Sequence, residues 1–433
     1  MDRRKFFGVN ASLAAGTTFM GNPSGAFAAD NGTVREPAKD IEVLDSADIV
    51  ILGSGPAGCG AAIAAGRLGL DVLLVERYGY LGGMPTGGLV IGYFEYNRGM
   101  KGITTEFVDR ITEEGGRWVE TNRVATHEPF FNPGVFQYMC LDMTRKANVR
   151  HLLHAWAVET TMKNGNIESV IIESKSGRQA IKAKMVIDCT GDGDTAEWTG
   201  VPFESSVEPN SLGLDFIYRN VNVDKLKMFQ KYEPEKYKKI MADLRKQGIG
   251  WGPWYIGTGD QAWFNTFFEG SPIDVLDLTA CEIDIRTKIN THFAFYRKNM
   301  PGFETAIIDK IATQTGTRVS RRIIGEHYIT LDELKGQTIP NSVGKICPIK
   351  EGDLVDVPYG ALIPQKVDNL LFAGRCISGT VEVIQRIRSI SACVVYGQAA
   401  GVAATLSIKD GIAPRNLEIA KLQDALTKQG VDI

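Results

Sequence analysis

The hydrophobic positions near the start of the chain form two short runs on either side of an alanine-rich stretch. The run "ADIVIL" predicts a strand over Asp48–Leu52, and "DVLLVE" predicts a second strand over Asp71–Glu76. The segment between them, Pro56–Leu70, has the composition of a helix. Apolar strands on either side of one helix, within about 30 residues, are typical of a parallel βαβ unit.

Beyond this unit the pattern changes. Residues 77–98 are rich in Gly and Tyr and predict an ordered loop, followed by helices over 101–114 and 134–147. From residue 149 onward, short apolar runs are separated by the turn dipeptides Asn164-Gly165 and Ser176-Gly177. Such dipeptides between strand-like runs predict antiparallel strands.

Residues 206–340 differ from both flanks, since they mix aromatic and polar positions and predict helices over 222–246 and 279–298. The second helix opens on the capping-box spacing of Thr279 and Glu282. After this region, the apolar strand and alanine-rich helix pattern of the first unit returns, in the strand "NLLFAG" and the long apolar helix "SISACVVYGQAAGVAATLSI". The predicted fold class is therefore α/β. A discontinuous Rossmann-like nucleotide-binding domain (48–205 and 341–433) carries an inserted α+β substrate or cap domain (206–340).

The N-terminus has the features of a targeting segment. Arg3, Arg4 and Lys5 precede a mildly apolar stretch, and Ala26 and Ala28 fit a small-residue cleavage site. We expect a signal peptide over 1–28, a linker over 29–47, and a location in the periplasm or otherwise outside the cytoplasm. The arginine pair followed by Phe6 favours the twin-arginine export machinery, which carries folded proteins, over the general secretory route. The stretch is too weakly apolar to predict an integral membrane protein.

Composition excludes several classes of function. The 433 residues are 23% charged with a net charge of -3 and no basic block, which argues against nucleic acid as a partner. The seven cysteines are scattered without a CxxC pair, so no zinc or iron–sulfur site is expected. Most lie in apolar runs and are expected to be buried thiols.

The motif "GSGPAGCG" carries the clearest chemistry. Gly53 permits a tight turn after the strand, Gly55 leaves room for a diphosphate, and Gly58 lets helix and strand pack closely. The helix N-terminus adds free N–H groups and a positive dipole end. Glu76 ends the second strand, where a carboxylate accepts hydrogen bonds from a ribose diol and disfavours a 2′-phosphate.

Later segments favour FAD over NAD as the dinucleotide. The doublet Gly82-Gly83 follows the second strand, "MVIDCTGDGD" ends a strand near Thr190, and "DNLLFAGRCISG" follows much later. FAD lies extended and contacts segments from both ends of a chain, whereas an NAD domain needs neither of these later segments.

These motifs resemble the FAD-dependent oxidoreductases of the glutathione-reductase-like superfamily, over most of the chain after residue 28. Further matching segments are "NMPGFETA", "TRVSRRIIGEH", "LTACEIDIR" and "RSISACVVYGQAAGVAA". The resemblance implies FAD, bound through its ADP half, its diphosphate and its flavin ring by Gly53, Gly55, Pro56, Ala57, Gly58, Glu76, Arg77, Gly82, Gly83, Met84, the backbone of Val158, Thr190, Gly191, Gly374, Arg375 and Ser389. No histidine stands in a recognisable flavin-linkage motif, so the FAD is expected to be noncovalent. Many members of the wider superfamily carry Asp where Arg375 stands.

Candidate catalytic residues are fewer. The resemblance places Arg388 at the pyrimidine edge of the flavin, where a cation stabilises negative charge. Arg318 and Arg322 are expected to share one face of a strand and could bind a carboxylate, although structural ion pairs explain them equally well. His292, His327 and Tyr359 are candidate acids or bases, each also explained by packing.

The sequence therefore predicts an exported FAD-dependent oxidoreductase that transfers a hydride between a small organic substrate and FAD. The single glycine-rich turn and the export signal indicate that the external electron acceptor or donor is a quinone, a carrier protein or oxygen, and not NAD(P)H. Two alternatives stay open: a flavin-binding assembly or maturation factor without turnover, and a flavin-dependent isomerase or lyase.

Overall fold

The fold is described from a computed structural model over residues 34, 36–92, 100–118, 130–256, 260–349 and 353–433. Contacts divide the chain into two units, residues 1–40 and 41–433, and everything below concerns the second unit. The predicted signal peptide, 1–28, lies outside the described residues.

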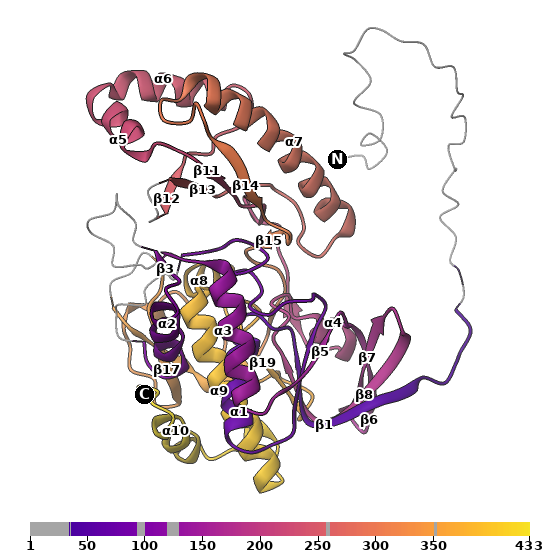
Figure 1. Ribbon diagram of the computed structural model, residues 1–433. Coiled ribbons are helices and arrows are strands. Elements are labelled where there is room, and N and C mark those ends of the chain that lie inside the picture. The colour runs from indigo at the N-terminus through magenta and orange to yellow at the C-terminus, as the bar shows by residue number, and fades with distance from the viewer. Residues whose placement is uncertain (1–33, 35, 93–99, 119–129, 257–259, 350–352) are drawn as a thin grey trace. The chain divides into compact units, whose positions relative to one another are not determined.

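The centre of the second unit is a parallel sheet in the order β5-β2-β1-β8-β19 (Figure 1). Its strands are β1 (Glu42–Leu52), β2 (Val72–Glu76), β5 (Arg150–Leu153), β8 (Gly177–Asp188) and β19 (Leu370–Phe372). The segments before residue 206 and after residue 340 thus contribute strands to one sheet. The predicted fold class, a discontinuous Rossmann-like domain with an additional region, is confirmed.

Strand β1 begins six residues before the strand predicted from "ADIVIL". Its first half is mixed in polarity and mostly exposed, but Glu42 and Val43 pair with Gln179 and Ala180 of β8. Because backbone pairing needs no apolar side chains, hydropathy alone did not reveal this extension.

Two further strands make an antiparallel meander with β8: β6 (Trp156–Lys163) and β7 (Asn166–Ser174). The turn between them is Asn164-Gly165, as predicted, with φ of 52° and 81°. Positive φ at both central residues is what a two-residue hairpin requires, and Asn-Gly supplies it at low cost.

Helix α1 (Pro56–Arg67) and helix α9 (Ile390–Asp410) pack backbone to backbone in the core. A Cβ at Gly397 of α9 would lie 2.0 Å from the carbonyl oxygen of Ala57, and one at Gly401 would lie 2.4 Å from that of Ala61. Among the described helices, α9 is long and apolar enough to cross a membrane, but 94% of that apolar window is buried inside the fold. This close packing fixes the N-termini of both helices beside the site described below.

The inserted region contains a four-stranded antiparallel sheet in the order β12-β13-β11-β14, with α5, α6 and α7 near it (Figure 1). The strands are β11 (Phe216–Arg219), β12 (Trp254–Ile256), β13 (Gln261–Phe264) and β14 (Ile307–Ile311). The helices are α5 (Val223–Tyr232), α6 (Pro234–Arg245) and α7 (Val275–Asn299).

Two predicted helices in this region need correction. The single helix over 222–246 is two helices, because Pro234 cannot continue α5 and instead starts α6. The helix predicted at 279 begins at Val275, with Asp274 as its cap: the Asp274 carboxylate accepts the backbone N–H groups of Leu276 and Asp277. The predicted capping box at Thr279 is therefore wrong.

The predicted Arg-rich strand is also wrong. The segment is split into β15 (Gly316–Thr317) and β16 (Arg322–Ile323), which pair with different strands. Arg318 and Arg322 consequently do not share a strand face. The other described elements are α2 (Ile103–Glu113), β3 (Arg117–Trp118), β4 (Phe130–Phe131), α3 (Pro133–Lys146), α4 (Asp194–Thr199), β9 (Phe203–Glu204), β10 (Leu212–Gly213), β17 (Ser342–Ile346), β18 (Val355–Pro358), α8 (Val381–Ile387) and α10 (Ile419–Lys428), with short 3-10 turns at Glu333–Lys335, Tyr359–Leu362 and Pro414–Asn416.

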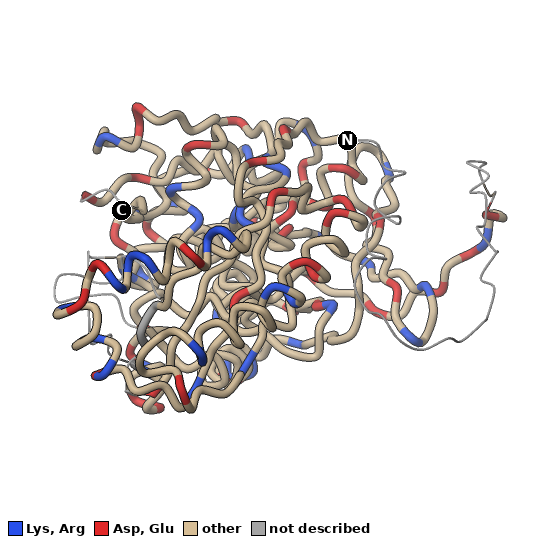
Figure 2. Tube along the Cα trace, turned by 90° about the horizontal axis from the view of Figure 1, so that it is seen from above, with Lys and Arg blue, Asp and Glu red and all other residues tan. Residues whose placement is uncertain are grey.

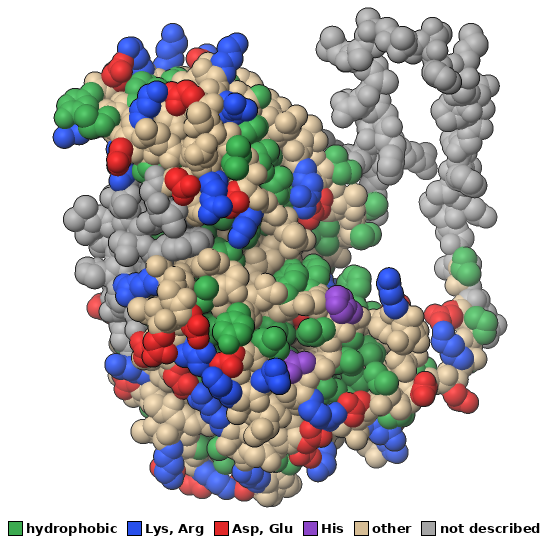
Figure 3. Space-filling model, in the orientation of Figure 1, with side chains coloured by type: hydrophobic (Ala, Val, Ile, Leu, Met, Phe, Trp, Pro, Cys, Tyr) green, Lys and Arg blue, Asp and Glu red, His purple; other side chains and the backbone are tan. Residues whose placement is uncertain are grey.

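Charged residues of both signs are interspersed along the described trace (Figure 2), and charged side chains of both signs are mixed on the face that Figure 3 presents. The expected buried thiols are confirmed: all seven cysteines are free and buried. The described residues contain no cluster of His, Cys, Asp and Glu suited to a metal ion.

Candidate active site

The candidate site consists of two adjoining cavities, and the first lies at the turn between β1 and α1. Gly53 has φ of 91°, and a Cβ there would lie 2.6 Å from the carbonyl oxygen of Cys189. A Cβ at Gly58 would lie 1.8 Å from the carbonyl oxygen of Gly53, whereas a Cβ at Gly55 would have nothing within 4 Å. The turn is thus tightly packed at Gly53 and Gly58 and open at Gly55, which lines the cavity. An open glycine at a helix N-terminus suits a diphosphate.

Glu76 closes one wall of this cavity at the end of β2. Its Oε2 accepts hydrogen bonds from the backbone N–H and the hydroxyl of Ser54 at 2.8 and 2.7 Å, and its Oε1 accepts the N–H of Tyr78 at 2.9 Å. A carboxylate offers about four acceptor positions, so these bonds fix the group and leave capacity for a ribose hydroxyl.

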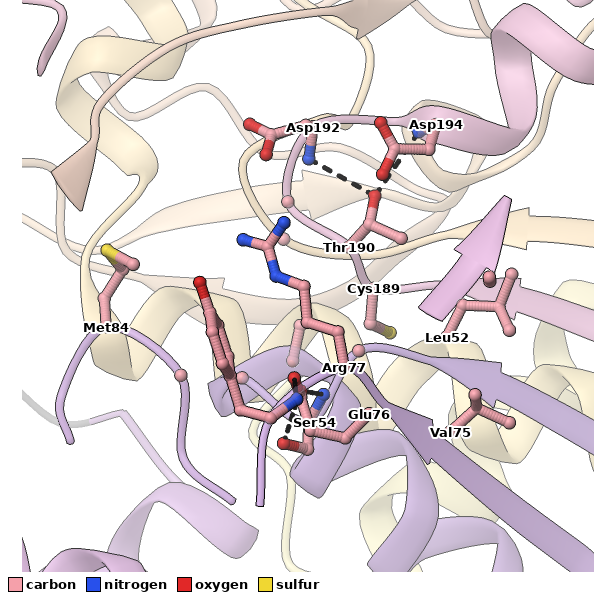
Figure 4. A pocket seen from close by; sticks show the side chains of 18 of the residues that line it. Leu52, Ser54, Val75, Glu76, Arg77, Met84, Cys189, Thr190, Asp192 and Asp194 are labelled. Carbon is pink, nitrogen blue, oxygen red and sulfur yellow. Dashed lines mark hydrogen bonds between the residues drawn. The ribbon is translucent and has the colours of Figure 1, made fainter. Parts of the chain in front are cut away.

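The opposite wall follows β8 (Figure 4). Asp188 is fully buried and accepts hydrogen bonds from Thr190 and Thr195. The hydroxyl of Thr190 in turn accepts the backbone N–H groups of Asp192 and Asp194, each at 3.3 Å. Burial, with the neighbouring charges of Asp192 and Asp188, raises the pKa of Asp194 to about 7.

Arg375 brings positive charge to the same cavity from the loop after β19. Its Nη2 donates to Oδ1 of Asp192 at 3.3 Å, while its Nη1 is buried and has no hydrogen-bond partner. A Cβ at Gly191 would lie 2.6 Å from Arg375 Nη2, so this glycine makes room for the guanidinium. A buried guanidinium nitrogen without a partner is costly, and an anionic diphosphate would satisfy it.

The far end of the cavity is aromatic. The guanidinium of Arg77 lies 4.9 Å from the ring centre of Tyr78 and 5.7 Å from that of Trp156. Trp156 and Ala157 line the cavity, whereas Val158, expected to contact adenine, is the next residue along β6 and does not. Flat, apolar surfaces here suit a planar base. Together with the glycine turn and Glu76, they show that the residues present fit FAD.

Most residues predicted to bind the cofactor lie around this one cavity. The lining includes Gly53, Gly55, Pro56, Ala57, Glu76, Arg77, Gly83, Met84, Thr190, Gly191, Gly374 and Arg375. Gly58 and Gly82 support it from behind: Gly82 donates its N–H to the carbonyl of Ser54. Ser389 caps α9 by accepting the N–H of Ala392 and lines a second cavity.

The second cavity, of about 250 Å³, meets the first at Pro56, Met84, Arg375 and Cys393. Its walls come from the inserted region, the loop after β2 and the start of α9, and they include Trp263, Val90 and Ile390. Trp263 is held by a hydrogen bond from Nε1 to the carbonyl oxygen of Leu89, 3.0 Å away. A mostly apolar cavity with a few polar groups, next to a dinucleotide site, is the usual form of a substrate pocket.

Among the described residues, Asp215 is the acidic side chain that lines this second cavity. It is 5% exposed, and its Oδ1 accepts the backbone N–H of Thr266 at 3.3 Å. Burial raises the pKa of Asp215 to about 7, against the opposing charge of Arg318. A carboxyl with a pKa near neutrality in a cavity is suited to accept or donate a proton.

Two arginines face the same space. Arg318 donates to the carbonyl oxygens of Asn210, Leu212 and Thr266 and to the side chain of Asn265. Arg388, between α8 and α9, has a buried Nε without a hydrogen-bond partner. Burial and the charges of Arg318 and Arg375 lower the pKa of Arg388 to about 10, so it remains a cation at neutral pH.

Four of the five predicted catalytic residues lie elsewhere. His292 is fully buried on α7, where it bonds Tyr218 and the carbonyl of Trp251, and burial lowers its pKa to about 3. Tyr359 donates to the carbonyl of Pro414. His327 bonds Glu333 at 2.5 Å, and Arg322 pairs with Glu204 at 2.8 Å. None of the four lines either cavity.

Asp215 and Trp263 were not among the site residues predicted from the sequence. A signal for Asp215 was present, because a single carboxylate stands inside the apolar run "LGLDFIY". An acidic residue between Leu214 and Phe216 in such a run marks a buried carboxyl or the wall of a cavity, because charged side chains are seldom buried without a partner.

Comparison with known proteins agrees with this geometry. The profile of the family described as FAD dependent oxidoreductase matches residues 48–426. A 3-(3-hydroxy-phenyl)propionate/3-hydroxycinnamic acid hydroxylase of Escherichia coli O139:H28 is 26% identical over 200 residues, 41% of this chain and 35% of the relative. Digeranylgeranylglycerophospholipid reductase 2 of Methanothermobacter thermautotrophicus is 27% identical over 151 residues, 33% of this chain and 39% of that protein. The chain thus spans little more than a third of the length of each relative.

Solved structures with a similar chain path include a geranylgeranyl bacteriochlorophyll reductase-like protein from Thermoplasma acidophilum, with a TM-score of 0.49 and 14% identity, covering 89% of this chain and 84% of that one. A p-nitrophenol 4-monooxygenase from Pseudomonas putida DLL-E4 has a TM-score of 0.49 and 12% identity, covering 89% and 85%.

Proposed function

The chain belongs to the family of FAD-dependent oxidoreductases, and on that basis we propose that it oxidises or reduces a small organic substrate bound in the second cavity. The observation that carries this proposal is the junction of the two cavities. One has the features of a FAD site, the other contains Asp215, and they share Met84, Arg375 and Cys393. A substrate in the second cavity would therefore lie next to the reactive end of the cofactor.

The roles of the chain's own residues follow from their positions. The β1–α1 turn, Glu76 and Arg375 would hold FAD, which when bound supplies hydride-transfer chemistry. Asp215 would accept the proton that a hydroxyl or amine of the substrate loses as the neighbouring C–H bond is broken, and would return it in the reverse direction. Trp263 and the apolar walls keep water away from the reacting atoms.

The remaining parts of the proposal concern location and electron transfer. The paired Arg3 and Arg4 and the cleavage pattern at Ala26 and Ala28 support export in the folded state. The sequence has one glycine-rich dinucleotide turn, at 53–58, which FAD would occupy. We therefore expect a quinone, a carrier protein or oxygen to exchange electrons with the flavin, and not NAD(P)H.

The test is anaerobic and spectroscopic. The purified full chain should release noncovalent FAD on denaturation, and its visible absorption should bleach with one member of a panel of alcohols, amines and organic acids. Reoxidation by a quinone analogue, together with no bleaching by NADH or NADPH, would support the proposed partner. Bleaching by either nicotinamide within the turnover time would contradict that part, and absence of FAD would contradict the whole.

Hydroxylation is the second candidate, because the curated relative from Escherichia coli is named a hydroxylase. Such a reaction inserts one atom of O₂ into the substrate and reduces the other to water, with two electrons and two protons from a donor. It requires O₂ for product formation and would carry ¹⁸O from ¹⁸O₂ into the product. Product formed anaerobically with an artificial acceptor would exclude it.

A further inference from the structure

Among the described residues, the lining of the second cavity has more positive than negative side chains. Arg318, Arg375 and Arg388 all line it, and Asp215 is its acidic lining residue. Arg375 is paired with Asp192, and Arg318 is surrounded by carbonyl oxygens. Within the described residues, Arg388 forms no ion pair, and its Nε has no hydrogen-bond partner. Among the described residues that line this cavity, Arg388 is thus the arginine that has neither an ion pair nor a side-chain hydrogen bond to the protein.

A guanidinium that lacks both an ion pair and a hydrogen bond at a buried nitrogen indicates a binding site for an anion. Withdrawing a cation from water is unfavourable unless an anion or hydrogen-bond acceptors compensate for it, and two neighbouring arginines make the cost larger. Its planar fork of donors matches a carboxylate in two parallel hydrogen bonds. A carboxylate bound at Arg388 would relieve both the missing hydrogen bond and the unbalanced charge.

The position of Arg388 favours the substrate over the cofactor as the source of that anion. Arg375 lines both cavities, but Arg318 and Arg388 line the second and not the first. An adjoining cleft shares Arg318, Ile349 and Arg388 with the second cavity, and its other charged lining residues are Arg386 and Glu208, so arginines outnumber acids there three to one. An organic anion arriving from outside would therefore meet arginines along its way to the cavity, which raises its local concentration.

We propose that the second cavity binds a small organic acid whose carboxylate is held by Arg388, with the apolar part of the molecule against Trp263, Val90 and Ile390. The inference deepens the proposed function, on which it rests, by naming the substrate class. Asp215 lies in the same cavity and would face the part of the molecule that changes its oxidation state.

Binding of unreactive probes tests this without turnover. Benzoate and butanoate are titrated into the FAD-loaded protein, each beside its uncharged amide, by calorimetry and by the change in flavin absorbance. We expect at least one acid to bind about tenfold to a hundredfold more tightly than its amide, the range of a charge-assisted hydrogen bond. Arg388→Gln should remove that preference, and Arg388→Lys should keep part of it. Arg219→Gln, at an exposed arginine of β11, is the matched control and should leave it unchanged.

Three outcomes would overturn the proposal: no saturable binding of either acid, equal affinity for acid and amide, or an unchanged preference in Arg388→Gln. If Arg388→Gln alters the flavin reduction potential but not the preference for acids, the arginine serves the cofactor and not the substrate. FAD content and reduction by dithionite are measured on the same samples. A failure of anion binding with a normal, reducible flavin leaves the proposed oxidoreductase intact.

Discussion

Arg375 and Asp192 form an ion pair in the lining of the first cavity, with 3.3 Å between Nη2 and Oδ1, and Nη1 of Arg375 has no hydrogen-bond partner. The ion pair fixes the orientation of the guanidinium, and an anion hydrogen-bonded to Nη1 would complete its hydrogen bonding.

We predict that Arg375→Gln weakens FAD binding by about 1.5–3 kcal/mol, the loss of one charge-assisted hydrogen bond. Arg375→Lys should recover part of the affinity, because it keeps the charge but loses the planar fork. The measurement is a titration of apoprotein with FAD, followed by quenching of flavin fluorescence. Unchanged affinity in Arg375→Gln would show that the diphosphate is held by the helix N-terminus alone.

The glycines of the first turn allow a sharper comparison. A Cβ at Gly55 meets nothing, whereas a Cβ at Gly58 would lie 1.8 Å from a backbone oxygen. Gly55→Ala should therefore leave the melting temperature of the apoprotein unchanged and weaken FAD binding by about 1–3 kcal/mol, since the methyl group fills space meant for the cofactor. Gly58→Ala should destabilise the apoprotein itself by about 3 kcal/mol. Equal effects of the two variants on apoprotein stability would contradict this description of the turn.

The sequence predicted the cofactor site better than the substrate cavity. The turn at Gly53, the acid at Glu76 and the hairpin at Asn164 each rest on local spacing, which the fold preserves. The second cavity joins Asp215 in the inserted region to Arg388 before α9. No local pattern links residues so far apart, because their meeting depends on how the inserted region packs on the loop after β2. His292 was a candidate catalytic residue that the fold places among aromatic side chains instead. Its sequence context could not show this, because a histidine in a helix looks the same in sequence whether it faces a cavity or an aromatic core.

Export is tested at residues outside the described structure. Changing Arg3 and Arg4 together to lysine keeps the positive charge of the segment but removes the arginine pair that the twin-arginine route requires. We expect the variant to remain in the cytoplasm with its signal uncleaved, as judged by fractionation and by mass. The matched control is Lys5→Arg, which should be exported normally. Normal export of the double variant would leave only the general secretory route.

The last prediction concerns the charge of Asp215. Its pKa is raised in the folded protein from 3.8 to about 7 by burial, while in the unfolded chain it keeps its ordinary value. Between pH 3.8 and about pH 7, Asp215 is protonated in the folded protein and ionised in the unfolded chain. Raising the pH through this range therefore lowers the free energy of unfolding. The wild type should thus lose up to about 4 kcal/mol of unfolding free energy between pH 4 and pH 8 that Asp215→Asn does not lose.

The same titration should govern the reaction. As a proton acceptor Asp215 must be ionised, so kcat/KM for substrate oxidation should rise with pH through about 7. Asp215→Asn should remove this limb and lower kcat by about 10²–10⁴-fold. Asp194 provides the comparison, because its pKa is also raised to about 7 but it lines the cofactor cavity. With FAD saturating, Asp194→Asn should retain the limb. A limb that persists in Asp215→Asn and disappears in Asp194→Asn would move the proton acceptor from the second cavity to the first.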